Sequence, residues 1–213
     1  YLGKQWFDIG LVSGTNDPGN DWFAPVTLIE RLPAASSGRF SRRGRPQYVP
    51  ADALLVLTSG QRSLIRDAPV VFVGKASGAM PPRTELAGKV AMLLDAGIEN
   101  SDRQNALLEA GASGGLTVLD GDRTLSSVRS RRLRPGYALA SDTLGGDLEA
   151  FITGSGLGNL LQGSGQSLAS LEQLAAKPDF SFLQLDLSAS LEATTREAAI
   201  RTSPVPEPRM LSM

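Results

Sequence analysis

Lys89-Val-Ala-Met-Leu-Leu-Asp95 is an apolar run with the length of one strand buried on both faces. A helix is predicted to follow it, capped by Asn100 or Ser101 and ended by Gly111. Gly115-Leu-Thr-Val-Leu119 is then predicted to be a second strand. A strand, a helix and a strand within about thirty residues predict a right-handed crossover between parallel strands.

Further elements are predicted on both sides of this crossover. Pro69-Val-Val-Phe-Val-Gly74 has the pattern of another buried strand. Shorter strands are predicted at Pro25–Glu30, Leu54–Thr58, Asp147–Thr153, Phe182–Leu187 and Leu191–Arg196. Helices are predicted at Tyr1–Gly10, around Leu157–Gln162 and at Ser167–Ala176. The fold class is therefore expected to be α/β, with βα crossovers and a few flanking helices.

Three segments are predicted to lack regular structure. Ser36–Pro46 is polar and rich in Gly and Arg, which is typical of a mobile loop or linker. Thr15–Asn20 has the composition of a turn. The tail from Thr202 to Met213 holds three prolines and is expected to be disordered.

Charge and hydropathy exclude two classes of partner. The 213 residues include 21 Lys and Arg against 22 Asp and Glu, which gives a formal net charge of −1. This balance provides no net basicity for nucleic acid, so we expect no nucleic-acid partner. The basic run at Arg129, Arg131, Arg132 and Arg134 is predicted to be a solvated loop. No apolar stretch has the length of a membrane segment, so no membrane partner is expected either.

The sequence contains no histidine and no cysteine. Without an imidazole, neither a Ser-His-Asp nor a Cys-His arrangement can form. Tetrahedral zinc sites also depend on these two residue types, so a zinc site made by this chain alone is excluded. We therefore expect no catalytic residue, no metal ligand and no cofactor in this chain.

Two glycine motifs match known patterns only superficially. Gly111-Ala-Ser113-Gly-Gly115 fits G-x-S-x-G, but a helix precedes the serine and a strand follows it, the reverse of a nucleophile elbow. Its glycines are expected to let the helix turn back tightly into the next strand. Gly154-Ser-Gly156-Leu-Gly158 lacks the third glycine of a dinucleotide fingerprint at the required place and is predicted to be a connection.

Two further groups of side chains leave alternatives open. Asp95, Asp120 and Asp122 could cluster at strand ends around a cation, although acidic residues there are more often turn formers. A second group is aromatic, and it either packs against neighbouring strands or forms an exposed platform for a peptide or sugar. Its members are Trp6, Trp22, Phe23 and Tyr48.

The order of several pieces resembles the protease-associated domain family. The first two are Ala68-Pro-Val-Val-Phe-Val-Gly74 and Glu85-Leu-Ala-Gly-Lys-Val-Ala-Met-Leu-Leu94. Arg103-Gln104, Glu109-Ala-Gly-Ala112 and Gly115-Leu-Thr-Val-Leu119 follow. Members of this family have a strand ending in Val-Gly, a Gly-Lys-Val strand, and a helix ending in Ala-Gly-Ala before the next strand. The flanks, Tyr1–Leu11, Leu160–Leu174 and Phe182–Leu191, resemble those around this domain in bacterial two-zinc aminopeptidases.

The resemblance implies a protease-associated fold, an open β-barrel or sheet, in a secreted or periplasmic protein. It implies three parts: an N-terminal arm (1–50), a core (51–176), and C-terminal strands with a Pro-rich tail (177–213). The implied role is a lid, a substrate-access wall or an interaction surface for a peptidase domain or its peptide substrate. The zinc would be held only by a separate catalytic domain. Ser77–Arg83 and Asp120–Pro135 are the expected wall segments, because they are long, polar or irregular.

Two other functions stay open. Pro204-Val-Pro-Glu-Pro208 replaces the strand that usually leads into the peptidase domain, so a free-standing peptide- or carbohydrate-binding module is one alternative. The other is a hydrolase that uses carboxylates alone, which requires two opposed acids in a cleft.

Overall fold

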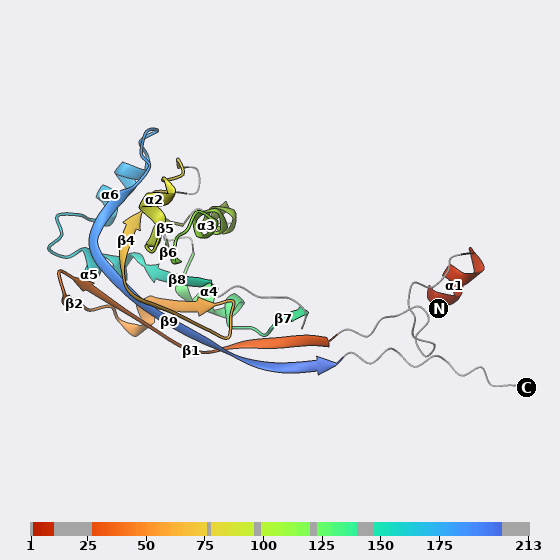
Figure 1. Cartoon of the computed structure of the whole chain (residues 1–213). Coiled ribbons are helices and arrows are strands. Elements are labelled where there is room, and N and C mark those ends of the chain that lie inside the picture. The colour runs from red at the N-terminus through yellow and green to blue at the C-terminus, as the bar shows by residue number, and fades with distance from the viewer. Residues whose placement is uncertain are drawn as a thin grey trace, which may run out of the picture. The chain divides into compact units, whose positions relative to one another are not determined.

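One mixed sheet organises the computed structural model of this chain (Figure 1). The structure describes residues 2–10, 27–75, 78–95, 99–119, 123–139 and 147–201. Its strands are β1 (Thr27–Arg42), β2 (Arg45–Gln47), β3 (Leu54–Thr58), β4 (Arg62–Phe72), β5 (Val90–Leu94), β6 (Gly114–Leu119), β7 (Gly136–Leu139), β8 (Leu148–Thr153) and β9 (Leu183–Arg201). In the described part of the chain these nine strands follow the order β2-β1-β9-β4-β5-β6-β8-β3, and β7 pairs with β1. The predicted α/β class is confirmed, and the sheet is open rather than a closed barrel.

The parallel part of the sheet is built around β5, all of whose residues are buried. β5 pairs in parallel with both β4 and β6, and β6 pairs in parallel with β8. α3 (Glu99–Glu109) connects β5 to β6, which confirms the predicted parallel crossover. The predicted caps are wrong, because Asn100 and Ser101 lie inside the helix. The end of the helix was predicted correctly, since Gly111 has a φ of +105°, a conformation that favours glycine.

The chain divides into two units. The first contains residues 1–31, 136–142 and 197–213, and the second contains residues 32–135 and 143–196. In the first unit, α1 (Leu2–Asp8) confirms the predicted helix, and the start of β1 pairs antiparallel with β7 from Leu28↔Leu139 to Arg31↔Gly136. The end of β9 from Glu197 also belongs to the first unit, and the rest of the sheet and the other helices belong to the second.

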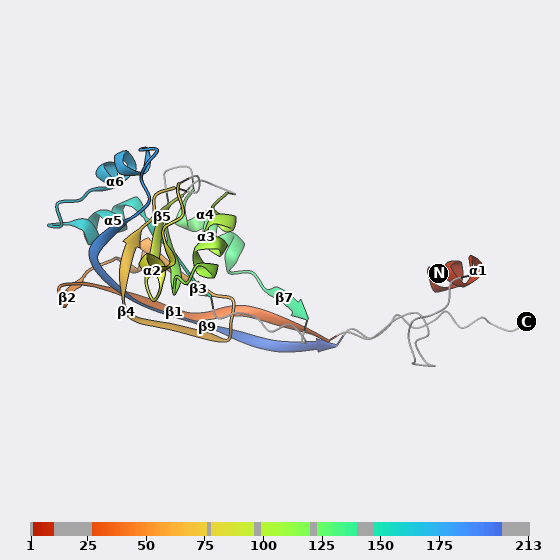
Figure 2. The ribbon, with the colours of Figure 1, turned by 45° about the horizontal axis from the view of Figure 1, so that its top comes forward.

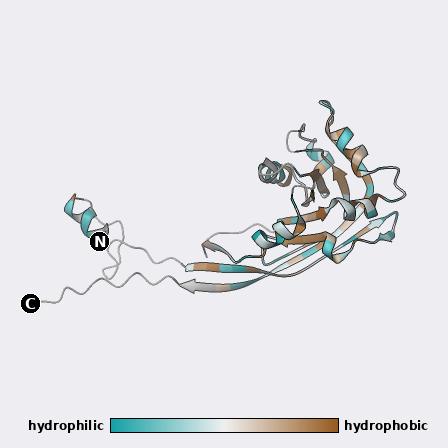
Figure 3. Cartoon of the chain, turned by 180° about the vertical axis from the view of Figure 1, so that it is seen from behind, coloured by the Kyte–Doolittle hydropathy of each residue, from teal (hydrophilic) through white to brown (hydrophobic). Residues whose placement is uncertain are grey.

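The core of the second unit lies on both faces of the parallel strands. One face of β4 and β5 presents Phe72 and Met92 to α5 (Gly154–Leu161) and α6 (Leu168–Ala175). The other face packs against α2 (Arg83–Leu86) and α3, and a separate cluster packs against α4 (Leu125–Arg132) (Figure 2). The most hydrophobic colours follow the central strands in Figure 3. Each large side chain that is fully buried there contributes about 2 kcal/mol to stability, which makes these strands the rigid part of the unit.

The predicted mobile loop at 36–46 is wrong, because β1 continues to Arg42 and turns directly into β2. Arg43 and Gly44, the two residues of the turn, have φ values of 49° and 73°, as a tight hairpin turn with right-handed twist requires. A Cβ at Gly38 would overlap the side chain of Leu54 in β3. The glycine therefore has a packing reason, and the segment is ordered despite its polar sequence.

Other boundaries also differ from expectation. The two predicted strands at 182–196 are one strand, β9, which pairs antiparallel with β4. β4 begins seven residues before the predicted strand and is interrupted by a bulge at Asp67, whose φ is 45°. α2, α4, β2 and β7 were not predicted, whereas the predicted β3, α5 and α6 are confirmed. Residues 15–20, 120–122 and 202–213, for which turns and a disordered tail were predicted, lie outside the described residues.

No helix in the described ranges is both long enough and apolar enough to span a membrane.

Candidate functional site

Two open hollows lie where the parallel strands begin. β5, β6 and β8 start immediately after Lys89, Ser113 and Asp147, and the first half of β4 projects beyond the start of β5. The first hollow has a volume of about 420 Å³ and is lined by Asn105, Leu108, Glu109, Ala112, Ser113 and Asp147. The second has a volume of about 500 Å³ and is lined by Arg62, Ser63, Leu64, Ile65, Arg66, Ala68, Gly88, Ser113 and Leu148. Because Ser113 borders both, we call the two together the amino-edge groove.

Opposite charges occupy the two ends of the amino-edge groove. Glu109 and Asp147 line the first hollow, and both are exposed. Arg62 and Arg66 line the second hollow and are also exposed. Arg62 forms an ion pair of 2.7 Å with Glu192. No ion pair among the described residues involves Arg66, Glu109 or Asp147. The groove therefore carries free acidic charge at one end and a free guanidinium at the other.

Ser113 lies at the centre of the groove, between α3 and β6. Its backbone N–H donates to the carbonyl of Lys89 over 2.8 Å, which fixes the turn between the helix and the strand. The helix precedes the serine, as predicted, so the nucleophile-elbow geometry is absent at this position. The sequence has no histidine to activate the hydroxyl, and the exposed side chain can donate or accept a hydrogen bond.

Asp95, the described member of the predicted acidic cluster, is held by an arginine. Its side chain is 1% exposed, and its Oδ1 accepts from Arg123 Nη1 over 2.9 Å. The Arg123 guanidinium also lies over the ring of Phe151, 5.7 Å from the centroid. Asp120 and Asp122 lie outside the described residues. No group of three or more acidic, histidine or cysteine side chains fit to hold a metal occurs among the residues that are described.

The basic run at 129–134 is not a solvated loop, because Arg129, Arg131 and Arg132 belong to α4. Arg129 Nη2 donates to the backbone carbonyls of Ala51 and Leu54, both over 3.1 Å. Arg132 forms an ion pair with Glu149 of β8. Burial lowers the pKa of the Arg132 guanidinium from its ordinary value, and the positive charge of Arg123 lowers it further. These arginines therefore attach α4 to the sheet.

The predicted wall segments are only partly irregular. Within Ser77–Arg83, the residues from Gly78 to Pro82 form neither helix nor strand, whereas Arg83 begins α2. Arg103 of α3 is 9% exposed, and its Nη2 donates to the carbonyl of Ala79 over 2.7 Å. Burial lowers the pKa of Arg103 from its ordinary value. Within Asp120–Pro135, α4 occupies Leu125–Arg132, so the expectation of an irregular loop is wrong there.

The other singled-out residues are dispersed. Gly154-Ser-Gly156-Leu-Gly158 is the start of α5 rather than a connection, and Thr153 caps it by accepting from the N–H of Gly156. Tyr48 is 77% exposed, and Trp6 is half-buried. Trp22 and Phe23 lie outside the described residues, so the predicted aromatic platform is not tested.

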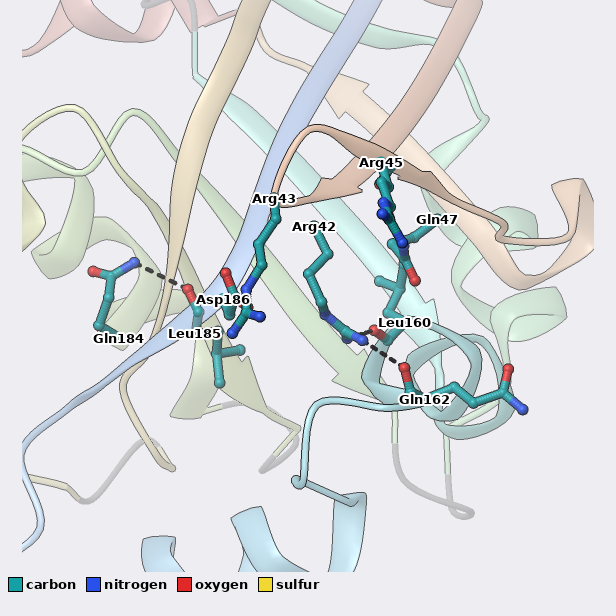
Figure 4. A network of polar contacts seen from close by, with 9 residues as sticks. All are labelled: Arg42, Arg43, Arg45, Gln47, Leu160, Gln162, Gln184, Leu185 and Asp186. Carbon is teal, nitrogen blue, oxygen red and sulfur yellow. Dashed lines mark hydrogen bonds and ion pairs between the residues drawn. The ribbon is translucent and has the colours of Figure 1, made fainter.

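A second polar cluster lies at the β1–β2 hairpin (Figure 4). The guanidinium of Arg42 donates to the backbone carbonyls of Leu160 and Gln162, at the carboxyl end of α5. Arg43 forms an ion pair of 2.8 Å with Asp186 of β9. The last carbonyls of a helix have no partner inside the helix, so Arg42 satisfies groups that would otherwise lack one. This cluster is consequently a structural connection between the hairpin and α5.

Replacing Arg42 with alanine is expected to lower the free energy of unfolding by about 1.5 kcal/mol, because two charge-assisted hydrogen bonds at a helix end are lost. Arg45→Ala is the matched control, since Arg45 is exposed on the opposite strand of the same hairpin and should change stability by less than about 0.5 kcal/mol. Urea denaturation of both variants measures the difference. Equal stability of the two variants would contradict a capping role for Arg42.

Comparisons with known proteins give matches among solved structures only. No protein-family model and no curated protein matches this sequence. Two structures of BSAP, a zinc aminopeptidase from Bacillus subtilis, are 13% identical to it and have TM-scores of 0.35. They match 87% and 86% of this chain and 38% of their own chains. An aminopeptidase from Aneurinibacillus sp. strain AM-1 is 13% identical, with a TM-score of 0.32, and the match covers 82% of this chain and 36% of that one. This chain thus spans well under half the length of these aminopeptidases.

Proposed function

We propose that this chain is a non-catalytic protease-associated domain of a secreted or periplasmic zinc aminopeptidase-like protein. In that protein it acts as a lid, a substrate-access wall or an interaction surface. Its partners are the peptidase catalytic domain, the peptide substrate, or both. Any zinc belongs to the catalytic domain.

The observation that carries the proposal is where the polypeptide enters and leaves the sheet. β1 and β9 are neighbours in the strand order. Arg31 near the start of β1 forms an ion pair with Glu197 near the end of β9, and the N–H of Ala35 donates to Thr194 Oγ1 over 3.2 Å. Since residue numbers rise along one strand as they fall along the other, the start of β1 and the end of β9 lie side by side. A domain inserted into another domain needs this arrangement, because its two connections must join neighbouring points of the host.

The chemistry of the sequence supports a non-catalytic role. Aminopeptidases of the two-zinc type need several strong metal ligands, and this chain has no histidine or cysteine to supply them. Glu109 and Asp147 do line one hollow, but both are exposed, and none of the described residues that line it is aromatic. The two catalytic acids of a glycosidase have different surroundings, which keep one protonated and the other ionised. This open hollow does not provide such different surroundings.

The test is to isolate the native polypeptide with an antibody raised against this chain. We expect a polypeptide larger than 22.4 kDa that hydrolyses aminoacyl p-nitroanilides and loses this activity when a chelator removes zinc. The purified 213-residue chain with added zinc should release no p-nitroaniline above the blank. A native product of 22.4 kDa without peptidase activity would refute the proposal and favour the free-standing binding module. Activity of the isolated chain would refute it as well.

A further inference from the structure

The amino-edge groove has the charge pattern of a site for a dipolar ligand. Glu109 ends α3 and Asp147 precedes β8, and together they make one end of the groove acidic. Arg66 on β4 makes the other end basic, whereas Arg62, four residues earlier on the same strand, is already paired with Glu192. A ligand that matches both ends must carry a positive group and a negative group, separated by the length of the groove.

The two charged ends lie close to one packing contact. β4 pairs with β5 only near its end, so Arg66 lies on the part of β4 that projects beyond the start of β5. A Cβ at Gly114 would lie 2.8 Å from Ile65, the neighbour of Arg66, and 3.0 Å from the backbone oxygen of Leu148, the neighbour of Asp147. A short peptide is therefore long enough to reach both ends.

Hydrogen-bonding side chains lie between the charged ends. Ser113 is exposed and borders both hollows, and Asn105 is exposed in the first hollow. A hydroxyl and an amide can each donate to or accept from a peptide backbone. Leu64, 43% exposed, offers an apolar surface in the second hollow. The groove therefore combines charges for the two ends of a peptide with groups for its backbone.

We propose that the amino-edge groove binds a short extended peptide by its two charged termini. The terminal ammonium lies at Glu109 and Asp147, and the terminal carboxylate lies at Arg66. This rests on the proposed function, because short peptides with free termini are the substrates and products of an aminopeptidase. The groove then serves to retain such peptides beside the catalytic domain.

The experiment is a titration of the full 213-residue chain with tetra-alanine, followed by the shifts of its backbone amides in two-dimensional NMR. We expect saturable shifts that are largest around Ser113, Gly88 and Asp147. Acetylating the amino terminus or amidating the carboxyl terminus should each weaken binding about two- to five-fold, the range expected of an exposed ion pair. The differences should shrink as salt is added, because exposed charges are screened.

Matched variants assign each peptide end to one end of the groove. The double variant Glu109→Gln/Asp147→Asn should make acetylated and free tetra-alanine bind equally, and Arg66→Gln should do the same for the amidated and free peptides. Glu172→Gln, which removes an exposed acid on α6, should leave both differences unchanged. Absence of saturable shifts up to about 10 mM peptide, or equal binding of the capped and free peptides to the unaltered chain, would overturn the proposal.

This result is separable from the test of the proposed function. If the native product has a mass of 22.4 kDa, binds the peptide and has no peptidase activity, the peptide-binding proposal stands and the accessory role is refuted. If the native protein is larger and active but this chain does not bind tetra-alanine, the accessory role stands and the peptide-binding proposal is refuted.

Discussion

Replacing Arg123 with alanine is expected to lower the free energy of unfolding by about 3 kcal/mol. The substitution removes the cation from a carboxylate, that of Asp95, whose side chain is 1% exposed. It also removes the guanidinium from the face of Phe151, a contact worth about 0.5–1 kcal/mol. A buried carboxylate that loses its cation retains the cost of its desolvation, and this cost dominates the effect.

The double variant Arg123→Ala/Asp95→Ala distinguishes this cause from general damage. It should be more stable than Arg123→Ala alone, because it removes the buried carboxylate together with the arginine. Arg131→Ala is the control: Arg131 is exposed on α4, and its loss should change stability by less than about 0.5 kcal/mol. Urea denaturation of these three variants, of Asp95→Ala and of the unaltered chain measures the coupling energy. If the double variant were less stable than Arg123→Ala, the carboxylate would not be the source of the loss.

The parallel centre of the fold could be predicted because its signals are local. Val90–Leu94 is apolar at every position, and few structures other than a fully buried strand accommodate such a run. Gly111 likewise marked the end of α3 through a conformation that favours glycine. These residues depend little on distant partners, so sequence reasoning found them.

The missed elements depend on partners far along the chain. In α4 only Leu125 and Val128 are buried, so its sequence resembles that of a solvated segment. The partners of its arginines, the carbonyl of Ala51 and the carboxylate of Glu149, come from distant parts of the chain. The sequence of β1 after Ser36 predicts a loop because it is polar and rich in Gly and Arg. Its order comes from pairing with β2 and from the contact of Gly38 with Leu54, and neither is a property of the segment itself.

The amino-edge groove could not be predicted from the sequence for the same reason. Arg66, Glu109 and Asp147 come from three separate segments, and only the strand order brings them to one edge of the sheet. Ser113 was noticed, but for a nucleophilic role that its surroundings do not support. Asp95 was noticed as a possible cation ligand, and its partner Arg123 lies 28 residues further along the chain.

Replacing Gly114 with valine is expected to lower the free energy of unfolding by about 3 kcal/mol, and replacing it with alanine by about 2 kcal/mol. Gly114 begins β6 beside Ser113 and is buried. A Cβ there would lie 2.8 Å from Ile65 Cδ1 and 3.0 Å from the backbone oxygen of Leu148. The isoleucine methyl can move, but the oxygen belongs to β8, which is paired on both sides. Relief of the clash therefore requires a shift between strands.

Gly158→Ala is the control with the opposite sign. Gly158 lies within α5, and a Cβ at this position meets nothing within 4 Å. Alanine stabilises an exposed helix position by about 0.5–1 kcal/mol relative to glycine, so this variant should be more stable than the unaltered chain. Thermal and urea denaturation of the three variants tests both signs. If Gly114→Val unfolded at the same urea concentration as the unaltered chain, the starts of β6 and β8 would not be packed as closely as described, and the floor of the amino-edge groove would be more open than its lining residues indicate.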